Sequence, residues 1–210
     1  MKSIRGHSLQ VAGRNVPLWM VASAFILAGA LAYAPYLPSG FAADDFIFIS
    51  MMEGATPYNP VLGFWSIPVD QCQGFTQLWW VDAASAGAFL RPVPSWTLTA
   101  LYSVFGRNAL PFHLTSAILH ALVAFTAFVL LRRLSGRDLP ALLAALLFLI
   151  CEDHAMTVAW IATITDLLCG LFLNLAFLCH VTGRQERRPW LFASSLLFFL
   201  IAFASKETAA

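Results

Sequence analysis

Charged residues are scarce in this sequence. Lysine, arginine, aspartate and glutamate together make up 11% of the 210 residues, and hydrophobic residues make up 60%. A soluble domain usually carries about 25% charged residues. The net charge of +1 offers no basic surface, so we expect no nucleic-acid partner. The four cysteines lack the spacing of a metal site. The composition therefore indicates an all-α, polytopic helical bundle embedded among membrane lipids.

Long apolar runs take the place of the missing charge. A helix needs about 20 apolar residues to cross a bilayer, and residues 17–37 supply them behind a basic leader. This run is longer than the apolar core of a cleavable signal peptide, about 7–15 residues, so we expect an uncleaved span. Further spans are predicted at about 111–131, 138–152, 160–181 and 189–205. The third of the five spans, residues 138–152, is short. It could tilt, thin the bilayer locally or follow a re-entrant course, and these alternatives stay open.

The basic residues give the predicted topology an independent test. With a cytoplasmic N-terminus, nine of the twelve basic residues fall on the inner side, as the positive-inside rule requires. They form three clusters: Lys2, Arg5 and Arg14; Arg132, Arg133 and Arg137; and Arg184, Arg187 and Arg188. The sequence therefore predicts five spans with the N-terminus inside.

Most acidic residues fall at or near the opposite, outer face. They are Asp44, Asp45, Glu53, Asp70, Asp82, Glu152, Asp153 and Glu207, with Asp166 slightly deeper in the fourth span. Acidic residues contribute little to topology, so their gathering points to chemistry on the outer side. The outer loop, residues 38–110, is rich in tryptophan (Trp65, Trp79, Trp80 and Trp96). Its apolar stretch 94–105 is too short to cross, and we expect one or two interfacial helices there.

The Asp44–Asp45 pair lies in the apolar stretch FAADDFIFIS. Neighbouring carboxylates raise one another's pKa, and a partly apolar setting can bring one of them into the range of a general base. The pair is equally consistent with a cation ligand or with a solvated loop end. Its residues alone leave these alternatives open.

Other polar residues lie near the predicted outer membrane face. His113 and His120 are seven residues apart, which places them on one helix face about 10 Å apart, too far for one metal ion. His154 precedes the fourth span and Asp166 lies inside it, where a carboxylate is expected to face protein or water. Arg91 and Lys206 are fixed cations that suit an anionic headgroup, or else snorkelling residues.

The order of these segments resembles the N-terminal membrane module of GT-C glycosyltransferases. A first span and the acid pair precede RPVPSWTLTALYSVFGRNALPFHLTSAILH, then HAMTVAWIATITDLL and a last span ending in SKETAA. The subset that it resembles most comprises relatives of dolichyl-phosphate-mannose protein O-mannosyltransferases, some of which carry tetratricopeptide repeats. The resemblance covers nearly all of residues 1–210. It implies a core of about seven spans, so we expect the sequence to be truncated.

The resemblance implies transfer of a sugar from a polyprenyl- or dolichyl-phosphate donor to a hydroxyl of an acceptor protein or glycan. It implies catalytic roles for Asp44 and Asp45, and in some members a divalent cation such as Mg²⁺ or Mn²⁺ held near them. It also implies substrate-binding roles at the matching positions Arg91, His113, His154, Asp166, Lys206 and Glu207.

A second interpretation is non-catalytic: a transporter-like or scaffold subunit, a degenerate relative or a gene fragment. Relatives commonly have an arginine at the position of Ile164, and its absence removes a phosphate contact. The excess of arginine over lysine, with abundant alanine and leucine, favours a bacterial inner membrane, with the endoplasmic reticulum membrane as the alternative.

Overall fold

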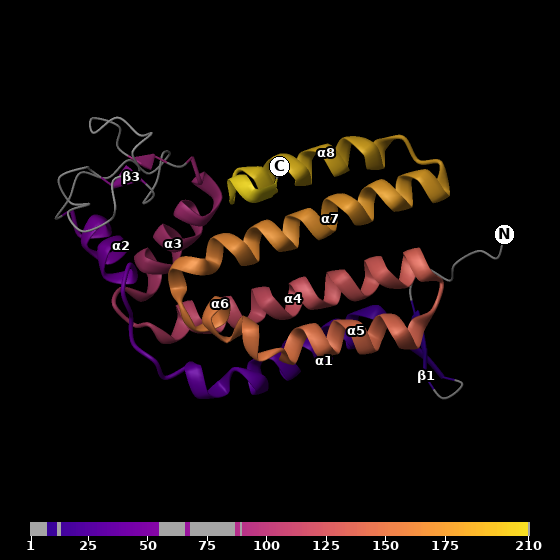
Figure 1. Ribbon diagram of the computed structural model, residues 1–210, viewed down its shortest axis with the longest axis horizontal. Coiled ribbons are helices and arrows are strands. Elements are labelled where there is room, and N and C mark those ends of the chain that lie inside the picture. The colour runs from indigo at the N-terminus through magenta and orange to yellow at the C-terminus, as the bar shows by residue number, and fades with distance from the viewer. Residues whose placement is uncertain (1–7, 12–13, 55–65, 68–86, 89, 210) are drawn as a thin grey trace.

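Helices make up most of the secondary structure. The computed structural model describes residues 8–11, 14–54, 66–67, 87–88 and 90–209 (Figure 1). The α-helices are α1 (Leu18–Ala32), α2 (Asp45–Met52), α3 (Pro92–Phe105), α4 (Leu110–Ser135), α5 (Asp138–Ile150), α6 (Ala155–Ala159), α7 (Ile164–Glu186) and α8 (Trp190–Phe203). Short 3₁₀ turns are η1 (Ala34–Tyr36), η3 (Glu152–His154), η4 (Ile161–Thr163) and η5 (Glu207–Ala209). The predicted all-α class is confirmed.

Two small antiparallel strand pairs accompany the helices. β1 (Ser8–Val11) pairs with β2 (Arg14–Pro17), and β3 (Ser66–Ile67) pairs with β4 (Gly87–Ala88). Several residues named from the sequence lie outside the described part of the chain: Lys2, Arg5, Trp65, Asp70, Trp79, Trp80 and Asp82. The same holds for segments 55–65 and 68–86 of the predicted outer loop.

A helix covers most of each of the five predicted spans, and α4 and α7 continue beyond the predicted ends. Two segments, Leu110–Ser135 and Ile161–Glu186, are long and apolar enough to cross a membrane. A third candidate is α5 together with Glu152–Ala159, two helical pieces that meet at a bend of 51°. α1 and α8 are apolar but only 15 and 14 residues long. Membrane-spanning helices are therefore present, while the count of five and the cytoplasmic N-terminus stay predictions.

The long helices lie side by side, so that the connections gather at two ends of the bundle. α4 packs against α1, α5 and α7, and α8 packs along α7. The α4–α5 and α7–α8 connections and the β1–β2 hairpin lie at one end, while α2, α3 and the chain end lie at the other (Figure 1). The arginine clusters of these two helix connections thus share one end of the molecule, and Asp44 and Asp45 lie toward the opposite end.

A close approach of α1 to α4 builds the first core. A β-carbon at Gly29 would lie 3.0 Å from Cβ of Ala121, so the absence of a side chain lets the helices meet. Small residues on α4 and α5 continue this contact around Phe25 and Phe128. Small residues at such interfaces allow the close van der Waals packing that holds helices together in lipid.

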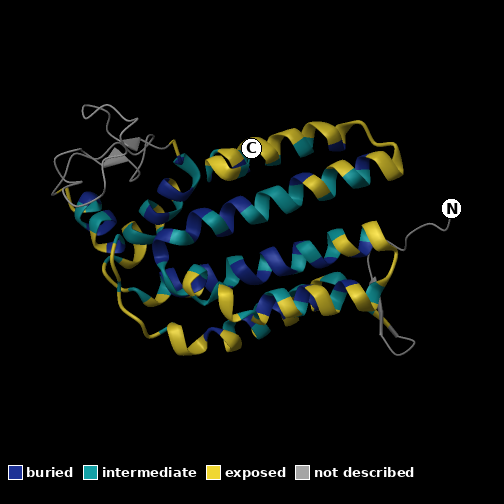
Figure 2. Cartoon of the chain, in the orientation of Figure 1, coloured by how far each residue is buried: buried dark blue, intermediate teal, exposed yellow. Residues whose placement is uncertain are grey.

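A second core lies at the end of the bundle that holds α2 and α3. Phe48 of α2, Leu98 of α3 and Phe112 of α4 pack with Ile161 and Ile164, which lie around the start of α7. Figure 2 shows that burial is concentrated on α4 and the first half of α7, whereas α8 is largely exposed. Its exposed side chains include Leu196, Leu197 and Leu200, an apolar surface suited to lipid. Packing in the second core fixes the short helices α2 and α3 to the bundle.

Candidate active site

Asp45 is the buried member of the acid pair. It begins α2 and is only 1% exposed. Its Oδ2 accepts a hydrogen bond from the Ala42 N–H at 3.0 Å, and its Oδ1 accepts one from the Ala162 N–H at 2.9 Å. Burial raises the pKa of this carboxyl above its usual value, although the two N–H groups favour the charged form. Asp45 therefore anchors the loop after α1 to η4.

Asp44 differs from its neighbour in each of these respects. It is the half-buried N-cap residue of α2, and its carboxylate has no hydrogen bond or ion pair with any residue whose placement is described. Ala43, directly before it, has a φ of 48°. This left-handed conformation costs a residue with a β-carbon about 1–2 kcal/mol, and such strain concentrates at functional sites. The carboxylate of Asp44 is therefore available to a ligand.

The two predicted histidines of α4 are both buried but have different surroundings. His113 is 1% exposed, with its Nε2 3.4 Å from the Gly40 carbonyl and its Nδ1 without a hydrogen-bond partner. His120 Nε2 lies 3.2 Å from the Leu149 carbonyl and 3.3 Å from the Tyr33 hydroxyl. Only His113 therefore lies beside the loop that leads to the acid pair.

His154 belongs to the surroundings of His120. Its ring centroid lies 5.1 Å from that of His120 and 4.4 Å from that of Phe148. Phe148 and His154 are therefore in contact across the bend between α5 and Glu152–Ala159. The structure thus separates His154 from His113, although the resemblance gave both of them a substrate-binding role.

The four remaining candidates form two ion pairs that hold the chain end in place. Arg91 makes a bidentate contact to Glu207 through Nε, at 2.9 Å, and a terminal nitrogen. Lys206 Nζ lies 2.6 Å from Oδ1 of Asp166, in the first turn of α7. Hydrogen bonding from Arg91 lowers the pKa of Glu207. Each candidate cation therefore already has a carboxylate partner.

The acid pair does not offer a set of ligands for the divalent cation that the resemblance implied. Mg²⁺ prefers six oxygen ligands at about 2.0–2.1 Å. Within the described ranges, no group of three or more His, Cys, Asp or Glu residues could hold a metal ion. Both oxygens of Asp45 accept backbone hydrogens, which leaves Asp44 as a single ligand. The described residues therefore do not by themselves supply such a set of ligands, and the cation stays a prediction.

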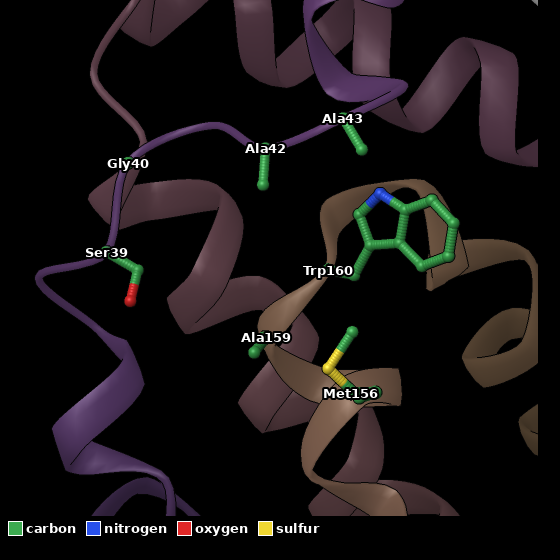
Figure 3. Close-up of a pocket in the computed structure, with 7 residues that line it drawn as sticks. All are labelled: Ser39, Gly40, Ala42, Ala43, Met156, Ala159 and Trp160. Carbon is green, nitrogen blue, oxygen red and sulfur yellow. The ribbon is translucent and has the colours of Figure 1, made fainter.

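A pocket of about 310 Å³ opens beside the acid pair (Figure 3). The loop through Ser39, Gly40, Ala42 and Ala43 forms one wall, and Met156, Ala159 and Trp160 form the other. Small and apolar lining residues gave no signal in the sequence, because alanine, glycine and methionine abound in membrane helices. Backbone N–H groups such as that of Ala162 are equally invisible to motif analysis.

A tie between α2 and α3 was also missed. Glu53 accepts hydrogen bonds from Tyr102 at 2.8 Å and from two nitrogens of Arg107 at 2.6 Å each. Hydrogen bonding from Arg107 lowers the pKa of Glu53 to about 2. The sequence identified Glu53 only as an outer acid, and its partner Arg107 lies 54 positions further along the chain.

The family of the chain follows from the part that begins just before α3. A sequence model of the dolichyl-phosphate-mannose-protein mannosyltransferase family matches residues 89–210, more than half of the chain. The chain belongs to this family. It is by family a membrane glycosyltransferase of the GT-C type. No curated protein and no solved structure matches it.

The family match bears differently on the two groups of candidates. It includes Arg91, the histidines and the ion pairs of the chain end, and it begins after Asp44 and Asp45. At position 164 the chain has an isoleucine, 1% exposed within the second core. Ile164 thus fills a packed position where the resemblance implies an arginine.

Proposed function

We propose that this protein transfers a sugar from a polyprenyl- or dolichyl-phosphate donor to an acceptor hydroxyl on the non-cytoplasmic face of the membrane. We place it in a bacterial inner membrane, as the composition favours. The observation that supports this most is the contrast within the acid pair. Asp45 is buried and has two backbone donors, whereas Asp44 follows a strained residue and has no partner in the described structure.

Asp44 is the general base in this mechanism. Its carboxylate takes the proton from the acceptor hydroxyl while the hydroxyl oxygen attacks the anomeric carbon of the sugar. The new bond joins that oxygen to the anomeric carbon. The bond between the anomeric carbon and the phosphate oxygen breaks, its electron pair stays on the lipid phosphate, and the configuration at the anomeric carbon inverts. Asp45 acts through its neighbour by fixing the start of α2.

Lys206 is the proposed contact to the donor phosphate. A lysine ammonium carries three N–H donors, and the described structure gives it one partner, Asp166. Two donors are therefore left for phosphate oxygens, whose negative charge grows as the sugar departs. Arg91 instead holds Glu207 with a bidentate contact and so places the neighbouring Lys206. This division assigns Arg91 and Glu207 a positioning role.

The experiment measures sugar transfer by the intact protein in membranes. Radiolabelled dolichyl phosphate mannose is the donor, and label in protein and in glycan is counted separately. We expect Asp44→Asn to lower the turnover rate about 10²- to 10⁴-fold, as the loss of a general base does. Lys206→Met should lower it about 10²-fold. Glu53→Gln is the matched control, an acid at the other end of the same helix, and should transfer at the wild-type rate.

Two outcomes would count against the proposal. Wild-type transfer by Asp44→Asn would remove Asp44 from the mechanism. A folded wild-type protein that turns over no lipid-linked sugar would favour the non-catalytic membrane subunit instead.

A further inference from the structure

The side chain of Asp45 ties together the two segments that form the walls of the pocket beside the acid pair. One wall is the loop 39–43 and the other is formed by Met156, Ala159 and Trp160 (Figure 3). Asp45 hydrogen-bonds to Ala42 on the first wall and to Ala162, two residues beyond the second. Because a buried side chain fixes both segments, the width of the pocket is set by the fold.

Among the residues that the structure describes, the lining of this pocket is apolar and includes no charged residue. It consists mainly of alanines, the thioether of Met156 and the indole of Trp160, and Ser39 supplies a side-chain hydroxyl. Trp160 Nε1 is buried and has no hydrogen-bond partner. Methionine adapts its shape to varied apolar groups. Such a surface suits an apolar group and disfavours a phosphate, which needs fixed positive charge or several N–H donors.

The position of the pocket relates it to the attacking hydroxyl. Ala43 lines the pocket and directly precedes Asp44. The wall of the pocket and the proposed general base are therefore neighbours in the chain, and an acceptor that reaches Asp44 has this wall one residue away. The proposed phosphate contact, Lys206, has its partner on α7, and it does not line the pocket.

We propose that the pocket binds an apolar side chain next to the accepting hydroxyl of a protein acceptor, and so selects serine or threonine residues with apolar neighbours. This inference rests on the proposed function. It adds a preference for apolar neighbours of the accepting residue and a specificity-determining surface formed by Ala159, Met156 and Trp160.

The first test varies the acceptor of the wild-type protein in membranes. Two blocked pentapeptides with a central threonine are compared, one flanked by valine and leucine and one by aspartate and asparagine. With dolichyl phosphate mannose as donor, we expect kcat/KM for the apolar peptide to be at least about tenfold higher, which is within the discrimination of an apolar pocket. Equal values for the two peptides would overturn the inference, as would transfer to glycan with none to peptide.

The second test fills the pocket. Ala159→Leu adds bulk to one wall, and Ala100→Leu adds the same bulk on the exposed face of α3 as a control. We expect Ala159→Leu to raise KM for the apolar peptide about tenfold without changing KM for the donor. A raised donor KM would place the lipid chain in the pocket and overturn the inference, as would two unchanged KM values. If Ala159→Leu does not fold, Met156→Ala enlarges the same wall and should weaken discrimination between the peptides.

These outcomes are distinguishable from failure of the proposed function. If wild-type protein transfers no sugar from the lipid donor to any acceptor, the glycosyltransferase proposal itself fails. If the wild-type protein transfers sugar to both peptides equally, only the pocket inference fails. The same holds if it prefers the apolar peptide but Ala159→Leu leaves that preference unchanged.

Discussion

The substitution Asp45→Asn would remove one hydrogen bond at a buried site. The loss in the free energy of unfolding follows from the two hydrogen bonds that Asp45 accepts. The amide oxygen of asparagine can still accept one backbone N–H, but its NH₂ group presents a donor to the other. One of the N–H groups of Ala42 and Ala162 then loses its acceptor, at a cost of about 1–3 kcal/mol in the free energy of unfolding. Alanine removes both acceptors. Since Ala162 is buried and Ala42 is exposed to water, we expect about 2–4 kcal/mol for Asp45→Ala.

Asp44→Asn is the matched control, because it makes the same chemical change one residue earlier. No residue in the described ranges forms a hydrogen bond or ion pair with that carboxylate, so the free energy of unfolding should stay within about 0.5 kcal/mol of wild type. Sugar transfer should nevertheless fall by orders of magnitude. For Asp45→Asn we expect the reverse pattern, a clear loss of stability with residual transfer at low temperature.

Thermal unfolding in detergent, followed by tryptophan fluorescence, measures the stability of each variant. Transfer from dolichyl phosphate mannose is measured on the same preparations. Equal unfolding midpoints for wild type and Asp45→Ala would refute the anchoring role of Asp45. Equal destabilisation by the two asparagine substitutions would refute the division of roles between the two acids.

Two further predictions concern the ion pairs Arg91–Glu207 and Arg107–Glu53. Glu207→Gln weakens the contact to Arg91, and because the Glu207 side chain is 46% exposed, we expect a loss of only about 1 kcal/mol at pH 7, seen as a lower unfolding midpoint. The folded-state pKa of Glu207 is lowered, so this difference should vanish as the pH falls through that value; a difference that persists in strong acid would contradict the assignment. The pKa of Glu53 is lowered from 4.5 to about 2, so its tie to Arg107 stabilises the fold fully above pH 4.5 and is lost between pH 4.5 and about 2. Melting curves of wild type and Glu53→Gln should therefore converge toward pH 2, and parallel curves over this range would refute the tie.

Hydropathy predicted the helices because a lipid environment forces backbone groups to pair within each apolar segment. For α4 the predicted span began one residue late and ended four residues early, since the helix continues from Leu110 to Ser135, where Gly136 caps it. The break between α5 and α7 was less predictable. At its start Cys151 is extended and caps α5. The chain then makes short helical pieces whose ends depend on contacts such as that between Asp45 and Ala162.

Local sequence cannot tell two adjacent aspartates apart, since Asp44 and Asp45 have the same chemistry and nearly the same neighbours. The start of α2 separates them, because successive side chains of a helix point about 100° apart and only one of them faces the core. The same holds for Arg91 and Lys206, which the sequence marks as cations. Their carboxylate partners lie 116 and 40 residues away.

By itself the sequence determined that this chain is a helical membrane protein with its acids gathered toward one end, because burying apolar surface and satisfying the backbone are requirements of each segment alone. It also pointed, by resemblance, to the glycosyltransferase family that residues 89–210 match. Only the tertiary structure decided which aspartate is anchored, which cations are paired, and where a pocket opens beside Asp44. These features arise between segments far apart in the chain, where a backbone N–H or the absence of a side chain matters as much as any motif.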